Sequence, residues 1–131
     1  MPTILIVDDN DDIRELLTLQ LEKRGCTVVV ARNGTEGVLA AANVCPSVIL
    51  MDVNMPDLDG FEATAQIRGN VSLSRTSVIL LTAYALPGDC ARALAAGCDD
   101  FHSKPIHFPT LFDQIDRLIA EKNFTQHPFG D

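Results

Sequence analysis

Basic residues are scarce in this sequence, and tryptophan is absent. Ten lysines and arginines stand against eighteen aspartates and glutamates, which gives a formal net charge of −8. A protein that binds nucleic acid needs a basic stripe or patch, so this balance argues against direct contact with DNA or RNA. The absence of tryptophan removes the usual fluorescent reporter of ligand binding.

Long apolar runs are also missing, because glycine, proline and polar residues interrupt each uncharged stretch. The sequence therefore contains no candidate transmembrane helix. Its first residues, Met1-Pro2-Thr3, lack the basic region that opens a secretory signal peptide. We expect a protein that does not insert into a membrane and that resides in the cytoplasm.

Four cysteines are present, and none belongs to a CxxC pair: Cys26, Cys45, Cys90 and Cys98. This spacing disfavours a zinc site. Without an export signal we expect no disulfide. The apolar or helical surroundings of the four favour buried free thiols.

Strand-like and helix-like segments alternate five times along the 131 residues. The sequence predicts strands over 3–7, 26–31, 47–51, 77–82 and 100–103, and helices over 12–23, 34–42, 59–68, 87–96 and 108–121. Such alternation is typical of an α/β fold, in which helices cover both faces of a parallel sheet. The length suits one domain, which we place at residues 1–122, followed by a C-terminal tail over 123–131.

Polar residues follow the predicted strands at their carboxyl ends. The first strand leads into Asp8-Asp9, the third into Asp52, the fourth ends at Thr82, and Lys104 follows the fifth. Ligands of open α/β sheets bind beyond this edge, so we expect these side chains to converge. Their convergence is the strongest functional signal in the sequence.

Three close carboxylates repel one another unless a cation lies between them. Carboxylate oxygens are hard ligands, which favour Mg²⁺. A carboxylate can also act as a nucleophile toward phosphorus, and a lysine and a hydroxyl can hold the phosphoryl oxygens. The set therefore predicts phosphoryl transfer to an aspartate, with Mg²⁺ as cofactor.

In these residues the sequence resembles the receiver domain of two-component response regulators. The resemblance extends from about Thr3 to Glu121, and its motifs are Asp8-Asp9, Asp52, Met55-Pro56, Asp59-Gly60, Leu81-Thr82-Ala83 and Lys104-Pro105. It implies a flavodoxin-like, doubly wound five-stranded parallel sheet of order 2-1-3-4-5 with five helices, a family whose fold is a standard example of the strand-end rule. It also implies a cis Lys104-Pro105 bond.

The same resemblance assigns roles to individual residues. Asp52 would accept the phosphoryl group, with Thr82 and Lys104 as the other catalytic residues. Thr82 and Phe101 would form the switch pair, Phe101 standing where many members have tyrosine. The expected metal ligands are Asp8, Asp9, Asp52 and the backbone carbonyl of Asn54. The bulky Tyr84, two residues after Thr82, is expected to shield the acyl phosphate from water.

The resemblance further implies a signalling switch rather than a conventional enzyme, one that catalyses only its own phosphorylation and dephosphorylation. The implied partners are a histidine kinase or histidine phosphotransfer protein and a downstream protein effector. The effector would be contacted by the face formed by the fourth helix, fifth strand and fifth helix. A single-domain regulator and the receiver of a hybrid histidine kinase both fit the sequence, as do a monomer and a phosphorylation-dependent dimer.

Three rival functions remain less favoured. A haloacid-dehalogenase-type phosphatase or phosphotransferase needs a second aspartate where this chain has Asn54. An FMN-binding flavodoxin needs a phosphate loop after the first strand, where the acidic run DDNDD would repel phosphate. A receiver that acts without phosphorylation would not need so complete a set of site residues.

Overall fold

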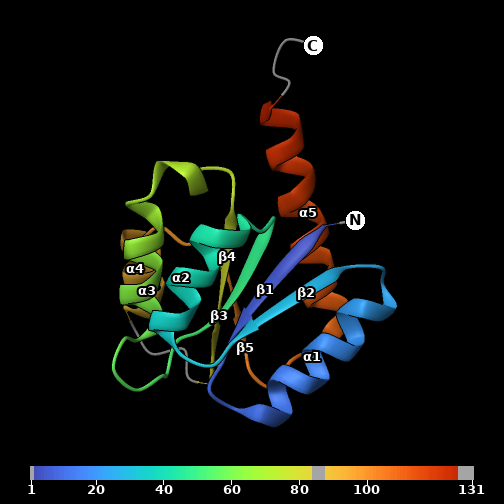
Figure 1. The fold of residues 1–131 in the computed structure, drawn as a ribbon, viewed down its shortest axis with the longest axis horizontal. Coiled ribbons are helices and arrows are strands. Elements are labelled where there is room, and N and C mark those ends of the chain that lie inside the picture. The colour runs from blue at the N-terminus through green and yellow to red at the C-terminus, as the bar shows by residue number, and fades with distance from the viewer. Residues whose placement is uncertain (1, 84–87, 127–131) are drawn as a thin grey trace.

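The computed structural model describes residues 2–83 and 88–126, apart from the side chains of Cys90 and residues 123–126. Strands and helices alternate through this part of the chain (Figure 1). Their bounds are β1 Thr3–Val7, α1 Asp11–Lys23, β2 Thr27–Ala31, α2 Gly34–Val44, β3 Val48–Asp52, α3 Gly60–Arg68, β4 Ser77–Thr82, α4 Asp89–Ala96, β5 Asp100–Ser103 and α5 Phe108–Gln126, with a short 3-10 turn at Val71–Leu73.

The five strands form one parallel sheet in the order β2-β1-β3-β4-β5. The expected fold class and strand order are therefore confirmed. The chain leaves β1 on one side to form β2 and returns on the other side of β1 to form β3. This reversal of direction creates a crevice at the carboxyl ends of β1 and β3, where ligands of such sheets bind.

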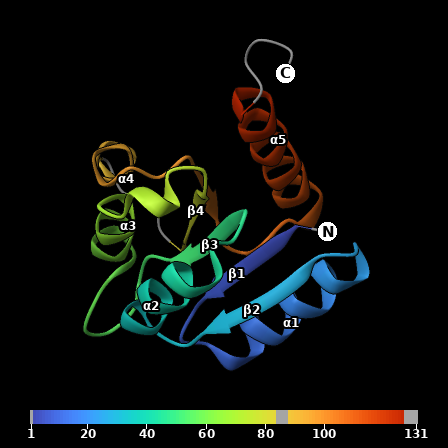
Figure 2. The ribbon, with the colours of Figure 1, turned by 45° about the horizontal axis from the view of Figure 1, so that its top comes forward.

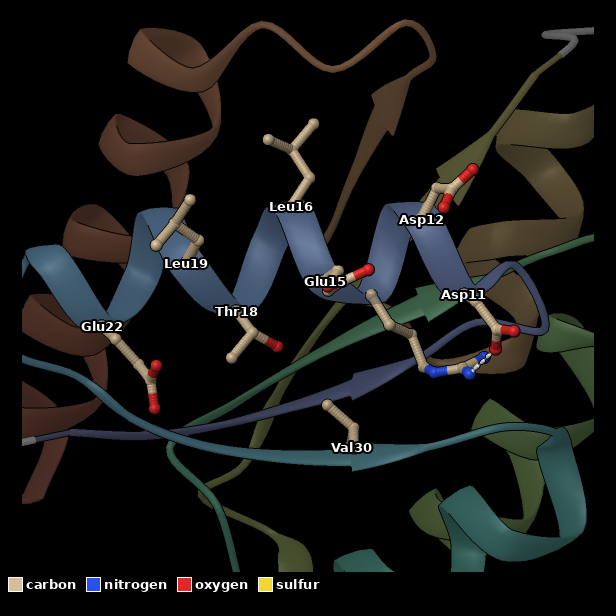
Figure 3. A pocket seen from close by; sticks show the side chains of 9 residues that line it. Asp11, Asp12, Glu15, Leu16, Thr18, Leu19, Glu22 and Val30 are labelled. Carbon is tan, nitrogen blue, oxygen red and sulfur yellow. Dashed lines mark hydrogen bonds and ion pairs between the residues drawn. The ribbon is translucent and has the colours of Figure 1, made fainter.

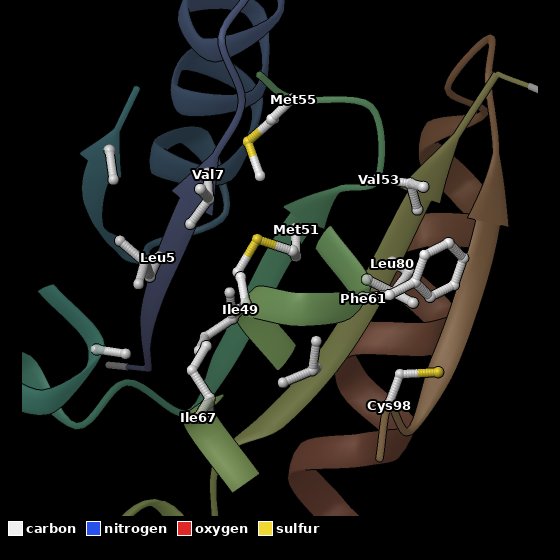
Figure 4. Close-up of a cluster of buried hydrophobic side chains, with 14 of the residues drawn as sticks. Leu5, Val7, Ile49, Met51, Val53, Met55, Phe61, Ile67, Leu80 and Cys98 are labelled. Atoms are coloured by element: carbon white, nitrogen blue, oxygen red, sulfur yellow. The ribbon is translucent and has the colours of Figure 1, made fainter. Parts of the chain in front are cut away.

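Helices cover both faces of the sheet, with α1 and α5 on one side and α2, α3 and α4 on the other (Figure 2). Alternation along β1 divides its side chains between the two cores. Leu5 and Val7 join the cluster of buried side chains drawn in Figure 4, which also contains Phe61 from α3. Ile4 and Ile6 join the opposite cluster, with α1 and α5. Because both faces are covered, β1, β3 and β4 can consist almost wholly of apolar residues.

Asparagine and aspartate side chains begin three of the helices. The side-chain oxygen of Asn10 accepts a hydrogen bond from the backbone N–H of Ile13, and Asn33 and Asp59 cap α2 and α3 in the same way. Each bond satisfies an N–H group that the helix itself leaves without a partner. The caps of α1 and α3 also fix where the loops after β1 and β3 end.

The structure differs from the sequence-based prediction at some element ends. Helix α5 continues to Gln126, five residues beyond its expected end, because no glycine or proline interrupts it before Pro128. The described part of α4 begins at Asp89, and Tyr84 and Pro87 lie outside the described residues, as do residues 127–131. None of the helices in the described part of the chain has the length and apolar character needed to cross a membrane.

The prediction that all the cysteines are buried was wrong for one of the three whose side chains are described. Cys26 and Cys98 are buried free thiols, whereas Cys45 is exposed. Cys45 follows α2 in a left-handed conformation with φ of 49°. At this position the chain turns away from the helix, so the side chain does not face either core. The side chain of Cys90 lies outside the described part.

Candidate functional site

The backbone ladder of the sheet brings the predicted site residues to one edge. The N–H of Lys104 donates to the carbonyl oxygen of Thr82 at 2.7 Å, and the N–H of Val53 donates to that of Leu81 at 2.9 Å. The N–H of Asp8 donates to the carbonyl oxygen of Ala31 at 3.2 Å. The ladder thus extends just past the strands and sets the depth of each side chain in the crevice.

Three carboxylates meet at this edge. Asp8, Asp9 and Asp52 each place an oxygen within 4.8 Å of the oxygens of the other two. Asp8 and Asp52 are buried, with 0% and 2% of their surface exposed, while Asp9 is exposed. The cluster therefore has two members inside the protein and one that faces solvent.

Lys104 lies between the two buried acids. Its Nζ is 3.2 Å from Oδ1 of Asp52 and 3.3 Å from Oδ2 of Asp8. Burial raises the pKa of Asp52, the neighbouring Asp8 raises it further, and Lys104 offsets only part of the effect. Burial alone would lower the pKa of Lys104, but the Asp52 and Asp8 carboxylates outweigh it and raise this pKa above its usual range. A single ammonium group thus pairs with two buried carboxylates and offsets only part of the negative charge of the site.

A divalent cation fits this arrangement. The oxygens are hard donors of the kind that Mg²⁺ prefers, and the exposed Asp9 leaves the cluster open on one side to water and ligand. Asp8 and Asp52 share the single ammonium of Lys104, so a further positive charge would be favoured beside them. Asp8, Asp9 and Asp52 are therefore the residues suited to hold the metal.

The loop after β3 folds back onto the phosphoacceptor candidate. The N–H of Asn54 donates to Oδ1 of Asp52 at 3.4 Å, and the N–H of Gly60 donates to the carbonyl oxygen of Val53 at 3.0 Å. A Cβ atom at Gly60 would lie 2.4 Å from the backbone oxygen of Asp52. Gly60 is thus required by a close approach of two backbone segments.

Thr82 and Phe101 occupy adjacent strands but different environments. Thr82 is 2% exposed and ends β4, where it pairs in register with Ser103, the residue before Lys104. Phe101 pairs with Leu80 and is partly buried, away from the acid cluster, in a surface pocket with Ala93 and Leu94 of α4. The Lys104-Pro105 bond is cis, as expected. Of the predicted site residues, the structure brings together the side chains of Asp8, Asp9, Asp52 and Lys104. Thr82 ends the strand between β3 and β5, and Phe101 lines a pocket at the α4–β5 surface.

The sequence-based prediction did not include Arg14. Its guanidinium donates from NH1 to the backbone carbonyl oxygen of Asp8 at 2.7 Å and pairs through NH2 with Asp11. Arg14 lies three residues after Asp11, a spacing that places the two on one helix face. That spacing indicated an ion pair on the helix, but nothing in the sequence indicated the contact with the backbone of Asp8.

Comparisons of this chain with known protein families, sequences and structures all point to the same family. Residues 4–116 match the family model described as the response regulator receiver domain. The chain is 38% identical over 120 residues to protein PilH of Pseudomonas aeruginosa, with 92% of this chain and 99% of that protein covered. It is 41% identical over 117 residues to hybrid signal transduction histidine kinase G of Dictyostelium discoideum, where 87% of this chain matches only 3% of the kinase.

A solved structure is similar along nearly its whole length. It is the receiver domain of a sensor histidine kinase from Pseudomonas aeruginosa, with a magnesium ion coordinated in its active-site cleft. The two chains superpose with a TM-score of 0.84 at 34% identity, which covers 91% of this chain and 98% of that one. The fold and the family assignment thus rest on independent comparisons of sequence and structure.

Proposed function

The chain belongs to the response regulator receiver domain family of two-component signalling, and from this premise we propose that it is a switch driven by phosphorylation of Asp52. The observation that carries the proposal is the position of Asp52 at the end of β3. It is buried, lies 3.2 Å from Lys104 and belongs to a cluster of three carboxylates. We further propose that this domain comprises residues 1–122 and acts in the cytoplasm.

The proposed reaction transfers a phosphoryl group from a phosphohistidine on a histidine kinase or phosphotransfer protein. A carboxylate oxygen of Asp52 forms a bond to phosphorus while the bond between phosphorus and the imidazole nitrogen breaks. The electron pair of that bond returns to the imidazole ring of the donor. Lys104 is close enough to Asp52 to hold a phosphoryl oxygen, and Thr82 at the end of β4 supplies a hydroxyl for another.

Asp8, Asp9, Asp52 and the backbone carbonyl of Asn54 are the proposed ligands of Mg²⁺. When bound, the ion supplies positive charge that offsets the repulsion between the incoming phosphoryl oxygens and the carboxylates. The residues of the chain hold these ligands in position. Asp8 is held by Lys104 and by the N–H of Asn10, which donates to its Oδ1 at 2.9 Å.

We propose that the response reaches the surface through Thr82 and Phe101. Thr82 lies beside Ser103 in the ladder, and Phe101 is two residues earlier on the same strand. The surface next to Phe101 carries Leu94, of which 73% is exposed. An apolar side chain this exposed suits a protein contact, so the α4–β5–α5 face is our candidate for the effector surface.

The phosphodonor is proposed to approach over α1. Leu16 and Leu19 lie along the same side of this helix as Asp12 (Figure 3). Asp12 is in the first turn of α1, which follows the Asp8-Asp9 turn in the chain. Leu16 is 46% exposed and Leu19 is 52% exposed. An apolar strip that begins beside the phosphoacceptor edge would let a partner helix place its phosphohistidine over Asp52.

Intact-mass analysis after incubation with Mg²⁺ and acetyl phosphate tests the proposal. We expect one phosphoryl adduct on the wild-type chain and none on Asp52→Asn or in the absence of Mg²⁺. Asp57→Asn is the matched control, because Asp57 is an exposed carboxylate of the same loop and should leave the adduct unchanged. Absence of the adduct from the wild type at saturating Mg²⁺, or its presence on Asp52→Asn, would contradict the assignment.

A further inference from the structure

Arg14 is more deeply buried than its ion pair explains. Only 12% of its side chain is exposed, whereas 85% of the side chain of its partner Asp11 is exposed. Ion pairs with an exposed partner contribute little to stability, because water screens them. The second contact of the guanidinium, with the carbonyl oxygen of Asp8 at 2.7 Å, is therefore the one that holds Arg14 in place.

This contact completes the set of bonds around Asp8. The backbone N–H of Asp8 donates to Ala31, its Oδ1 accepts from Asn10, and its Oδ2 faces Lys104. Arg14 occupies the remaining polar group, the backbone carbonyl. Each polar group of this buried residue thus has a partner from a different part of the chain.

The carbonyl of Asp8 also belongs to the peptide plane that leads to Asp9. Because a peptide unit is planar, a bond that fixes the carbonyl of Asp8 also fixes the direction in which the chain enters Asp9. Among the described residues, no hydrogen bond or ion pair holds the Asp9 carboxylate itself. The orientation of Asp9 toward the cluster therefore depends on its backbone, and Arg14 is the side chain that restrains this backbone.

We propose that Arg14 is a positioning residue that holds the Asp8-Asp9 turn in the conformation required to bind Mg²⁺. This inference rests on the proposed function, which makes the two aspartates metal ligands. The described contacts of Arg14 are with Asp8 and Asp11 rather than with Asp52. Its effect is on the affinity for the metal rather than on the phosphoryl transfer that follows.

Two substitutions separate geometry from charge. Arg14→Lys keeps the positive charge but loses the planar fork that reaches Asp8 and Asp11 together. Arg14→Gln loses the charge, and removal of a nearby positive charge by itself would strengthen the binding of a cation. If Arg14 acts by geometry, both variants bind Mg²⁺ more weakly. If it acted only by charge, Arg14→Gln would bind Mg²⁺ more tightly.

The test is calorimetric titration of the full chain with Mg²⁺, well below the unfolding temperature of each variant. We expect both variants to lose about tenfold in affinity, as is usual when a group that orients a metal ligand is removed. Arg32→Gln is the matched control, since Arg32 is an exposed arginine paired with Glu36 at the start of α2 and should leave the affinity unchanged. At saturating Mg²⁺ the rate of phosphorylation by acetyl phosphate should stay within about twofold of the wild type, a split that a merely structural role would not produce.

The outcomes distinguish this inference from the function on which it rests. Wild-type affinity, or tighter binding, in Arg14→Gln would overturn the positioning role while leaving the metal site intact. If Arg14→Gln does not fold, Arg14→Lys decides, and unchanged affinity there overturns the role. Failure of the wild type to bind Mg²⁺ would overturn the proposed function and this inference together.

Discussion

At Asp52 the requirements of chemistry and of stability oppose each other. As the proposed phosphoacceptor, Asp52 must present an ionised oxygen inside the protein, yet burial and the neighbouring Asp8 disfavour that charge and raise the pKa of Asp52. Lys104 pairs with both acids and offsets only part of the unfavourable free energy of the buried Asp52 charge. Without bound metal, the buried charge of Asp52 therefore lowers the stability of the wild-type protein.

Replacement of Asp52 by asparagine should stabilise the metal-free protein. We expect the free energy of unfolding at pH 7 to rise by about 1 kcal/mol, a size common for substitutions that relieve a functional strain. Asparagine removes one buried charge and leaves Lys104 paired with Asp8. Urea unfolding followed by circular dichroism measures the change, and Asp57→Asn, an exposed acid of the same loop, should have no effect.

The pH dependence of this difference follows from the direction of the shift. Because the pKa of Asp52 is raised in the folded state, protonated Asp52 favours folding. That contribution is fully present below the unfolded value of about 4 and is lost as pH rises through the raised pKa. The advantage of Asp52→Asn should therefore be close to zero near that lower limit and grow with pH. A variant less stable than the wild type at pH 7 would contradict this account.

Single residues were predictable from sequence where their type and their position in an element agreed. Asp8, Asp9, Asp52 and Lys104 are polar residues at the carboxyl ends of strands, and the structure brings them together. Arg14 was missed because its important partner is a backbone carbonyl, and such a contact cannot be inferred from residue types. The roles assigned to these strand-end residues, and those assigned to Thr82, Phe101 and Asn54, stay predictions.

Among the elements, α4 is held to the rest of the protein by few contacts. No side chain caps its start, and Ala93 is the buried residue among its described side chains. Arg92 adds two links to α3, since its guanidinium carbon lies 4.2 Å from the centre of the Phe61 ring and its NH2 is 3.9 Å from Asp59. Asp59 and Phe61 lie where the loop that follows Asp52 enters α3.

Removal of Arg92 should loosen α4 without unfolding the protein. We expect Arg92→Ala to increase hydrogen exchange of the α4 amides several-fold, because a cation–π contact and a weak ion pair together are worth about 1 kcal/mol. Exchange in β1 and β3 should not change. Arg32→Ala, which removes an exposed arginine from the connection between β2 and α2, is the control. Equal protection of α4 in the wild type and Arg92→Ala would show that Arg92 does not restrain the helix.

Element types followed from periodicity, while element ends depended on local chemistry. The bounds predicted for 3–7, 77–82 and 100–103 coincide with β1, β4 and β5. The end of α5 was placed too early because its last residues are mostly polar yet still compatible with a helix. Hydrophobic periodicity detects the buried face of a helix, so it does not detect the part of a helix that extends past the core.

For the whole molecule, the sequence alone predicted a parallel sheet with two helical layers, while the order of the strands came from the family resemblance. Local patterns define each β-α unit but carry little information on which strand lies beside which. Long-range polar contacts that connect the layers were likewise outside the reach of sequence reasoning. Asp99, in the connection from α4 to β5, makes the most extensive of these among the described residues.

Asp99 joins the two helical layers at the end of the sheet opposite the site. Its Oδ2 accepts from NH2 of Arg68 in α3 at 2.6 Å and from the N–H of Val78 in β4 at 2.8 Å. Its Oδ1 lies 3.6 Å from Nζ of Lys122 in α5. Arg68 also donates to the carbonyl oxygens of Gly97 and Leu73, so the cluster connects both helical layers to the sheet.

Loss of the Asp99 carboxylate should therefore destabilise the protein as a whole. We expect Asp99→Ala to lower the free energy of unfolding by about 2 to 3 kcal/mol, the range for hydrogen bonds to charged groups that lose their partner. Asp99→Asn should cost less, because its side-chain oxygen can still accept from Val78. The control is Asp116→Ala, which removes an equally short contact with Arg24 from a more exposed position and should cost less than about 1 kcal/mol. Equal losses in Asp99→Ala and Asp116→Ala by urea unfolding would mean that the layers are held together by their apolar cores alone.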